Sequence, residues 1–448
     1  MIRLHNSLSR EVEDFVPEDP SLVRMYVCGP TVYDTPHVGN CRPAVVFDVL
    51  YRLLRLVYPK VVYARNITDI DDKIMQRAQR DGLDIGELTT RTTAEYHRIV
   101  DALGCLRPDH EPRATGSIPE IQAMIAALIE RGHAYVSQGH VLFEIASFPE
   151  HGALSRHETK NLESGASNRV DAADYKRAPE DFILWKPSSA EQPGWDSPWG
   201  RGRPGWHIEC SAMIDSVFGS GVDIHGGGGD LRFPHHDCEI SQTACAHPGT
   251  VLARMWLHNG MVLHKGQKIA KSTGNIVDVS QLIDAKGGPA VRATLLASHY
   301  RQPLNLDMEA NAWANIIDRW HDAAGDDDTD ESVDFAFNPV ITALSLDLNT
   351  PRAFAEMHRL AGIASDDGAE SARASAFLRQ GLLVLGLQPS GRKRSFAVSD
   401  AEAALIHARE EARKNRDYVT SDRLRQELKS CGIEVEDSKE RTVYRRSV

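Results

Sequence analysis

The fold is decided by residues 23–66, which read VRMYVCGPTVYDTPHVGNCRPAVVFDVLYRLLRLVYPKVVYARN. The apolar run 23–28 predicts a buried strand that ends at a Cys-Gly-Pro turn, and residues 60–66 predict the next strand. Between them, residues 43–57 place apolar side chains at helical spacing, namely Val46, Leu50, Leu53, Leu54 and Val57. A strand, a glycine loop, a helix and a second strand open a doubly wound parallel sheet, so we expect an α/β fold.

The middle of the chain is expected to add helices and further strands to this sheet. Helical patterns at about 88–103 and 118–131 precede a hairpin at 134–145. Residues 150–205 are rich in Pro, Gly, Trp and charge, which predicts an irregular insertion. Residues 206–275 predict a return to sheet.

The last third is expected to be mainly helical. The pattern is helical from Pro289 to about residue 388, with an acidic loop at 326–331. Residues 388–394 are typical of a linker. Two helices and a strand pair are then predicted at 400–415, 419–430, 433–436 and 442–445.

Composition indicates a soluble, multidomain protein of the cytoplasm. The 448 residues are 42% apolar and 25% charged, and no apolar run approaches the roughly 20 residues that span a bilayer. No apolar segment of a secretory signal follows the first residues, so neither a membrane nor secretion is expected. Seven scattered cysteines fit a reducing compartment, where cysteines are thiols or metal ligands.

Charge is unevenly distributed along the chain. The net charge is −12, which argues against a nucleic-acid partner for most of the protein. Residues 391–448 nevertheless contain more Lys and Arg than Asp and Glu. This tail is therefore the better candidate for contact with a polyanion, although a solvated helical surface would have the same charge.

Two short motifs predict a triphosphate site. His37-Val38-Gly39-Asn40 lies at a predicted helix start, where backbone N–H groups, the helix dipole and a histidine can all face phosphate oxygens. Lys268-Ile269-Ala270-Lys271-Ser272 supplies two lysines for the charge that develops on leaving pyrophosphate. Alone, the first motif is more typical of helix capping and the second of a solvated loop. Their order along the chain favours ATP-dependent activation of a carboxylate.

A dense run of possible metal ligands follows the glycine-rich stretch 226–229. It contains His235, His236, Cys238, Glu239 and Cys245. These residue types bind zinc, but they also pack and hydrogen-bond in protein cores. The run by itself leaves both interpretations open.

Five longer motifs together resemble the cysteinyl-tRNA synthetase family of class I aminoacyl-tRNA synthetases over almost the whole chain. They are residues 25–34 (MYVCGPTVYD), 65–73 (RNITDIDDK), 205–213 (GWHIECSAM), 223–230 (DIHGGGGD) and 233–239 (FPHHDCE). The resemblance implies activation of L-cysteine with ATP and Mg²⁺, release of pyrophosphate, and transfer of cysteine to tRNA(Cys). It also suggests a monomer.

The resemblance implies one zinc ion per chain with a more dispersed ligand set than the dense run. The implied ligands are Cys28, Cys210, His235 and Glu239. His235 and Glu239 are four residues apart and face one way on a helix. Zinc can expand from four ligands to five, which leaves room for the sulfur of the substrate, and serine has no equally soft donor. The substrate residues implied by the family pattern are Gly29, Thr68, Trp206, His225 and Asp230.

The implied domains are the two halves of a Rossmann-like catalytic domain at 1–115 and 206–290, a connective insertion at 116–205, a helical domain contacting the tRNA stem at 291–388, and an anticodon-binding domain at 391–448. In the last of these, the predicted anticodon contacts are Arg425, Asp437 and Tyr444. Single-stranded bases are read by stacking and by their hydrogen-bonding edges.

Four positions depart from the family pattern. Asn40 stands where the family usually has His, while Ile269 and Ala270 stand where it has Met and Ser. Tyr444 replaces a Trp, which reduces the area for stacking. Both lysines of the second motif are present, so we expect altered ATP affinity or loop kinetics rather than lost activity.

Two alternative functions compete with this interpretation. The paralogous ligase that joins cysteine to a glucosaminyl-inositol in mycothiol synthesis would share the zinc and ATP sites but needs no anticodon domain. A non-catalytic zinc protein that binds RNA would not need His37, Lys268 and Lys271. The tail 391–448 favours tRNA as the acceptor.

Overall fold

The structure is a computed structural model that describes residues 1–156, 174–219, 221–264, 266–269, 277–306, 310–325, 334–366, 368–387, 400–431, 433–437 and 442–446. The chain forms two compact units, residues 1–390 and residues 391–448. Among the described residues, no helix has the length and apolar character needed to cross a membrane. The acidic stretch 326–331 and the linker 388–394 lie outside the described residues.

A four-stranded parallel sheet organises the first unit. Its order is β10 (Ala253–Asn259), β9 (Val222–Gly228), β3 (Val23–Val27) and β4 (Val61–Arg65), and all three pairings are parallel. Met25 of β3 lies in register between Tyr63 of β4 and Ile224 of β9. The predicted α/β class with a parallel sheet is therefore confirmed.

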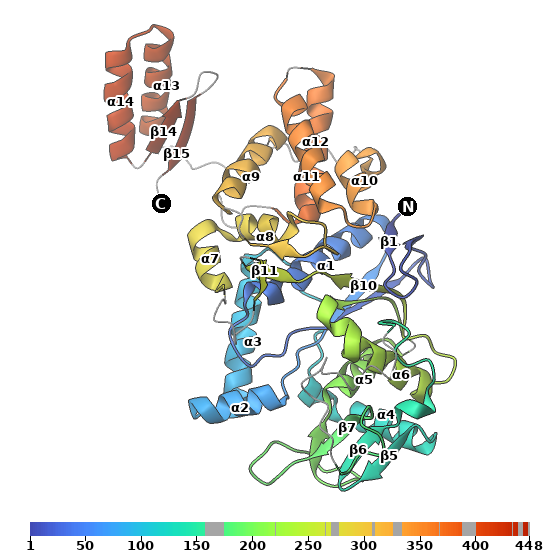
Figure 1. The fold of residues 1–448 in the computed structure, drawn as a ribbon. Helices are drawn as coiled ribbons and strands as arrows, with labels where there is room; N and C mark the ends of the chain where they lie inside the picture. Colours follow the sequence, from blue (N-terminus) through green and yellow to red (C-terminus); the bar gives the residue numbers. More distant parts are fainter. Residues whose placement is uncertain are drawn as a thin grey trace. The chain divides into compact units, whose positions relative to one another are not determined.

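Helix α1 (Val38–Val57) connects β3 to β4 and packs on the sheet (Figure 1). It begins at Val38, at the His37 motif that was expected to lie at a helix start and before the apolar pattern of residues 43–57. Pro43 lies inside the helix. The helix starts earlier because His37 and Asn40 cap its first turn.

Helices flank the sheet on the side of β4. Helix α3 (Ile85–Ala102) confirms the predicted pattern at 88–103, whereas α2 (Asp72–Asp81) was not predicted. Asp71 caps α2 by accepting a hydrogen bond from the N–H of Lys73. Only Ile74 and Ala78 of α2 are buried, so the helix presents few apolar residues from which a sequence pattern could predict it.

The segment between the two halves of the sheet has its own core. Helix α4 (Ile118–Glu130) and the hairpin of β5 (Ala134–Ser137) and β6 (His140–Phe143) confirm the predictions. The prediction that residues 150–205 are entirely irregular is wrong. Strands β7 (Phe182–Pro187) and β8 (Gly202–Pro204) extend the hairpin to a four-stranded antiparallel sheet. The Pro and Gly residues at their ends concealed these short strands, of which β8 is an edge strand.

The prediction of sheet throughout 206–275 is also wrong. Residues 206–218 form α5 (Trp206–Phe218), and residues 237–246 form α6 (Asp237–Ala246). Both helices are buried over most of their surface, so they lack the polar stripe that identifies a surface helix. Strands β9 and β10 are sheet as predicted.

Small strands and a helical layer complete the first unit. The short strands are β1 (Arg3–His5), β2 (Val12–Asp14), β11 (Val262–His264), β12 (Gln267–Lys268) and β13 (Leu304–Asn305). The helices are α7 (Val279–Lys286), α8 (Gly288–Leu296), α9 (Ala310–Ala324), α10 (Pro339–Ser345), α11 (Thr350–Ala364) and α12 (Ala369–Leu385). The main apolar core runs continuously from the sheet into this layer, and the predicted helical region after Pro289 is confirmed.

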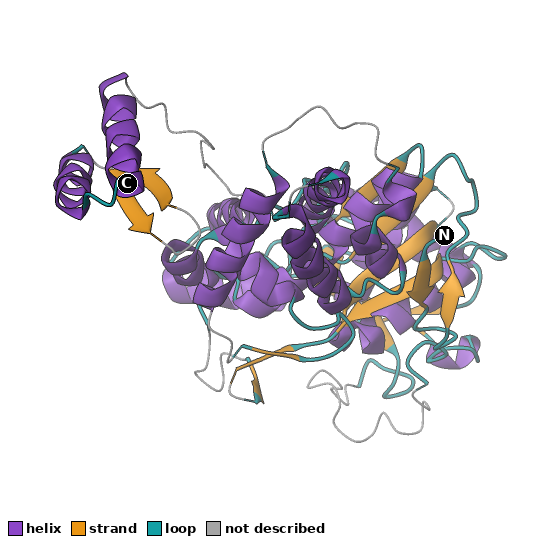
Figure 2. Cartoon of the chain, turned by 90° about the horizontal axis from the view of Figure 1, so that it is seen from above, coloured by secondary structure: helices purple, strands orange, loops and turns teal. Residues whose placement is uncertain are grey.

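The second unit contains two helices and a strand pair, as predicted. Helices α13 (Asp400–Lys414) and α14 (Tyr418–Ser430) pack together beside β14 (Ile433–Asp437) and β15 (Thr442–Arg446), next to the C label in Figure 2. Its small core joins Leu428 of α14 to Ile433 and Val435 of β14.

Candidate metal centre and nucleotide site

Six side chains that can ligate a metal meet beside the carboxyl ends of β3 and β9. They are Cys28, Cys210, His225, His235, His236 and Glu239, and all are buried. The N–H of Cys28, the residue after β3, donates to the carbonyl of Gly226 in β9. Ligands of open parallel sheets bind outside the carboxyl ends of the strands, so the cluster lies where the topology favours a site.

The four implied zinc ligands are brought together from three separate segments: Cys28 after β3, Cys210 in α5, and the adjoining residues His235 and Glu239. The Sγ atoms of Cys28 and Cys210 lie 3.6 Å apart, and Glu239 Oε1 lies 3.5 Å from Cys28 Sγ. His235 Nε2 lies 2.9 Å from the same carboxylate oxygen, so these two side chains face one way as expected. All four ligand atoms lie within 4.8 Å of one another.

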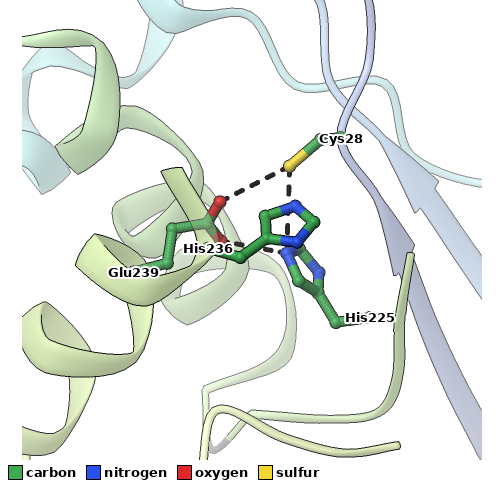
Figure 3. A group of neighbouring side chains, drawn as sticks. All are labelled: Cys28, His225, His236 and Glu239. Carbon is green, nitrogen blue, oxygen red and sulfur yellow. Dashed lines mark hydrogen bonds and ion pairs between the residues drawn. The ribbon is translucent and has the colours of Figure 1, made fainter. Parts of the chain in front are cut away.

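A second group of four side chains shares two members with the first. It consists of Cys28, His225, His236 and Glu239, whose side chains point toward one another in Figure 3. His225 Nε2 lies 3.0 Å from Glu239 Oε2 and 3.8 Å from Cys28 Sγ. The carboxylate of Glu239 thus presents one oxygen to each group.

Two further histidines hold the neighbouring rings of His235 and His236. His207 Nδ1 lies 3.0 Å from His235 Nδ1, and His258 Nε2 lies 2.8 Å from His236 Nδ1. Metal-binding histidines usually have their second nitrogen held in this way. Sequence reasoning missed both partners, because neither lies in a motif with ligand spacing.

The side chains of the cluster shift one another's protonation equilibria. Burial raises the pKa of Cys28, and the hydrogen bond from Cys28 lowers that of Cys210 to about 6. Burial alone would lower the pKa of His235, but Glu239 and Cys210 raise it to about 10. Burial would raise the pKa of Glu239, yet His225 and His235 hold it well below its usual value. The buried thiolate and carboxylate are therefore stabilised by positive charge.

Only some residues of the dense run 235–245 belong to the cluster. His235, His236 and Glu239 contribute to the groups described above, whereas Cys238 and Cys245 belong to neither. Cys238 and Cys245 are buried thiols whose pKa burial raises. A zinc ligand set that includes these two cysteines is therefore wrong.

Gly29 directly follows Cys28, and Asn66 connects it to Thr68. The N–H of Gly29 donates to Asn66 Oδ1, and Asn66 Nδ2 donates to the hydroxyl of Thr68. A Cβ atom on Gly29 would lie 1.7 Å from the backbone oxygen of Asn66. Glycine is therefore required for this close approach, and Asn66, which sequence reasoning did not single out, connects the two positions.

Two of the other implied substrate residues lie at the same cluster. The ring of Trp206 stacks on His235 with centroids 4.3 Å apart. His225 is itself a member of the cluster, and its ring stacks on Tyr26. Asp230 lies in a short 3-10 turn that follows β9.

The His37 motif lies beside a small pocket at the start of α1. The pocket is lined by residues 30–37 together with Asn40, Thr92 and Tyr96. His37 Nδ1 accepts a hydrogen bond from the N–H of Gly39 at 3.1 Å, and Asn40 Oδ1 accepts one from the N–H of His37. The motif is thus a helix cap and borders a pocket as well. A Cβ on Gly39 would lie 2.9 Å from the His37 ring, so glycine also leaves room for the cap.

The second motif is only partly described. The backbone of Lys268 belongs to β12 and pairs with Leu263 of β11. Lys271 and Ser272 lie outside the described residues. Val277 is the first described residue after this segment. Its carbonyl accepts a hydrogen bond from the N–H of Val38, so Val277 lies against the His37 motif.

The predicted anticodon residues all lie in the second unit. Arg425 of α14 donates through Nη2 to the carbonyl of Val435 at 2.9 Å. Asp437 ends β14, and Tyr444 lies in β15 opposite Val435. Arg425 therefore joins helix α14 to strand β14.

Comparisons with known proteins agree over the whole chain. Residues 14–315 match the sequence model of the class I (C) tRNA synthetase catalytic domain, and residues 397–445 match that of the cysteinyl-tRNA ligase anticodon-binding domain. The chain is 50% identical over 454 residues to a cysteine–tRNA ligase of Acidiphilium cryptum, covering 100% of this chain and 99% of the relative. It is 49% identical over 455 residues to that of Xanthomonas campestris, with the same coverage.

Solved structures share the fold at low sequence identity. The methionyl-tRNA synthetase of Mycobacterium tuberculosis in complex with methionyl-adenylate has a TM-score of 0.59 at 16% identity, covering 82% of this chain and 90% of that structure. A leucyl-tRNA synthetase from Agrobacterium radiobacter has a TM-score of 0.57 at 12% identity, covering 84% of each chain. With two family domains and full-length relatives at about half identity, the chain belongs to the cysteine–tRNA ligase family of class I aminoacyl-tRNA synthetases.

Proposed function

We propose that this chain activates L-cysteine with ATP at the described cluster and transfers the cysteinyl group to the 3′ end of tRNA(Cys). The observation that carries the proposal is the convergence of two thiols, an imidazole and a carboxylate in one buried cluster. Cys28 of this cluster directly follows β3, and the capped His37 motif, our candidate site for phosphates, ends the same β3–α1 connection. The family and its ligase activity support the same reaction.

The donor set fits zinc. Around a tetrahedral zinc ion, ligand atoms lie roughly 3.3–3.8 Å apart, given Zn–S of about 2.3 Å and Zn–N or Zn–O of about 2.0–2.1 Å. The Cys28–Cys210 and Cys28–Glu239 separations of 3.6 and 3.5 Å are in this range. The 2.9 Å contact between His235 and Glu239 would have to open slightly. We therefore assign Cys28, Cys210, His235 and Glu239 as the ligands of one zinc ion per chain.

When bound, zinc would supply an electrophile that favours the thiolate of substrate cysteine. The chain's own residues surround that position. Trp206 stacks on His235, while Asn66 hydrogen-bonds to both Gly29 and Thr68. We assign Gly29, Thr68, Trp206, His225 and Asp230 to the substrate cysteine.

In the activation step, the carboxylate of cysteine attacks the α-phosphorus of ATP and forms cysteinyl-adenylate as pyrophosphate leaves. We assign His37, Gly39, Asn40, Lys268, Lys271 and Ser272 to ATP, with Mg²⁺ on the phosphates. The charged donors among these would stabilise the pyrophosphate charge that grows in the transition state. Asn40 supplies no positive charge, and its amide oxygen is already used in the cap.

A ribose hydroxyl at the 3′ end of tRNA then attacks the carbonyl of the adenylate, and AMP leaves. We propose that the second unit reads the anticodon through Arg425, Asp437 and Tyr444. The match of residues 397–445 to the family's anticodon-binding domain supports this role. We also propose the domain division 1–115 and 206–290 for catalysis, 116–205 for the connective insertion, 291–388 for the tRNA stem and 391–448 for the anticodon, in a monomer of the cytoplasm.

Charging of purified tRNA(Cys) with radiolabelled cysteine tests the acceptor. We expect ATP-dependent, acid-precipitable cysteine on tRNA(Cys) and none on a glucosaminyl-inositol acceptor. The cysteine–glucosaminyl-inositol ligase alternative has no support among the relatives, which are cysteine–tRNA ligases over their full length. Transfer to the amino sugar instead of tRNA would overturn the proposed acceptor.

A further inference from the structure

We propose that the cluster offers a divalent cation a second position, whose ligands are Cys28, His225, His236 and Glu239. The inference rests on the proposed metal site, because both positions share Cys28 and Glu239. It assigns His236 a role as an alternative ligand. One cation occupies one position at a time, since the two positions use the same thiolate and the same carboxylate.

The carboxylate of Glu239 faces both positions. Its Oε1 atom lies near Cys28 and His235 of the first position, at 3.5 and 2.9 Å. Its Oε2 atom lies 3.0 Å from His225 Nε2 of the second. A cation can therefore pass from one position to the other without losing its contact with this side chain.

His236 has the environment of a metal ligand rather than of a packed core histidine. Its ring is fully buried, and its Nδ1 atom is held by His258, whose own Nδ1 lies 2.8 Å from the hydroxyl of Ser7. Its Nε2 atom has no hydrogen-bond partner within the part of the chain that the structure describes. Buried polar atoms nearly always have a partner. The unpartnered Nε2 atom of His236 is therefore the atom that we expect to ligate the cation.

Gly227 in strand β9 leaves room for the ring of His236. A Cβ on Gly227 of β9 would lie 3.2 Å from His236 Nε2 and 3.0 Å from its Cε1 atom. That contact is too tight for most side chains to be accommodated without moving the ring. Glycine at 227 therefore preserves the position of His236 beside His225, whose ring centroid lies 4.6 Å away.

The two positions differ in chemistry. The first provides two thiolates, one imidazole and one carboxylate, whereas the second provides one thiolate, two imidazoles and one carboxylate. The second set is less negatively charged and contains fewer sulfur atoms. It would hold the cation when the thiolate of Cys210 is lost through substitution or oxidation.

A double-mutant cycle on the full-length chain tests the second position. Zn²⁺ affinity is measured by chelator competition, and thiolate ligands are counted from the sulfur-to-metal absorption of Co²⁺, for wild type, Cys210→Ala, His236→Ala and the double variant. We expect Cys210→Ala to bind one Co²⁺ with one thiolate instead of two. We expect His236→Ala to lower Zn²⁺ affinity less than about twofold beside Cys210, but at least about tenfold in its absence.

Two control variants accompany the cycle. Cys238→Ala removes a buried thiol outside both positions and should leave both the Zn²⁺ affinity and the Co²⁺ absorption unchanged. If circular dichroism shows that His236→Ala misfolds, His225→Ala takes its place. Loss of all metal from Cys210→Ala, or an equal effect of the histidine variant in both backgrounds, would overturn the second position. Failure of wild type to bind Co²⁺ would instead overturn the proposed metal site itself.

Discussion

At the residue scale, Glu239 shows what sequence can and cannot indicate. Its spacing of four from His235 predicted that the two side chains meet, and their 2.9 Å contact confirms it. Nothing in the spacing connected it to Cys28, which is 211 residues away and lies 3.5 Å from its carboxylate. That proximity depends on the parallel pairing of β3 with β9, so it was predicted only through the family resemblance.

Replacement of Cys210 by Ser tests its assignment as a ligand. We expect Cys210→Ser to lower zinc affinity by more than about tenfold and to raise the KM for cysteine, because a hydroxyl is a poor substitute for a thiolate. Chelator competition and cysteine-dependent pyrophosphate exchange measure the two effects. Cys238→Ser is the matched control, since this thiol is buried outside the ligand groups; unchanged metal and cysteine affinity in Cys210→Ser would remove it from the ligand set.

His151 should make stability depend on pH. Burial lowers the pKa of its imidazole from 6.5 to about 4, and its Nδ1 lies 2.8 Å from the hydroxyl of Ser241. The unfolded chain binds the proton more tightly, so the stabilisation is complete above pH 6.5 and is lost as the pH falls toward 4. Between pH 7 and pH 5 this group should cost about 2 kcal/mol of unfolding free energy, at about 1.36 kcal/mol per pH unit.

Urea unfolding at these two pH values checks this effect, with His151→Asn for comparison. Asparagine keeps a polar group near Ser241 but does not titrate. The variant should therefore lose less stability than wild type between pH 7 and pH 5. An identical pH dependence in the two proteins would show that His151 is not the group responsible.

At the element scale, helix boundaries depended on local hydrogen bonds that periodicity does not reveal. Helix α1 starts where His37 and Asn40 form a capping box, at the motif that was expected at a helix start, whereas the apolar pattern begins only at residue 43. Helix α5 was interpreted as sheet because it is buried on nearly every side and so lacks alternation of polar and apolar faces. Strands β7 and β8 were missed because their ends are rich in Pro and Gly.

The segment after β12 should act in the activation step. We expect Lys271→Ala to slow cysteine-dependent ATP–pyrophosphate exchange by about 10–1,000-fold, by analogy with removal of a donor to transition-state charge. Lys265→Ala, which removes a lysine that precedes β12 and lies outside the motif, should exchange close to the wild-type rate. Wild-type exchange by Lys271→Ala would refute its assignment to ATP.

At the scale of the whole molecule, the sequence predicted the class of fold and the order of its parts better than their details. The strand–helix–strand opening, the late helical region and the final helix–helix–hairpin arrangement are all confirmed. They rest on local periodicity and turn residues, which act within a few residues of one another. The metal cluster required contacts between β3, β9, α5 and α6, which local patterns do not specify.

The two-unit organisation predicts that activation and tRNA charging can be separated. Deletion of residues 391–448 removes the unit that matches the anticodon-binding domain. We expect the shortened chain to retain pyrophosphate exchange but to lose most aminoacylation of tRNA(Cys), because recognition of the anticodon is absent. Both assays on one preparation measure this, with circular dichroism as the control for folding; equal loss of both activities would mean that the second unit mainly stabilises the first.

The most direct test of the proposed function is ATP–pyrophosphate exchange by the zinc-loaded, full-length chain with L-cysteine or L-serine at matched concentrations. Serine differs from cysteine only in the atom that would meet Cys28, Cys210, His235 and Glu239. We predict exchange with cysteine and no exchange above the amino-acid-free background with serine. Equal exchange with both amino acids would contradict recognition of cysteine by the metal cluster, and no exchange with cysteine would contradict activation itself.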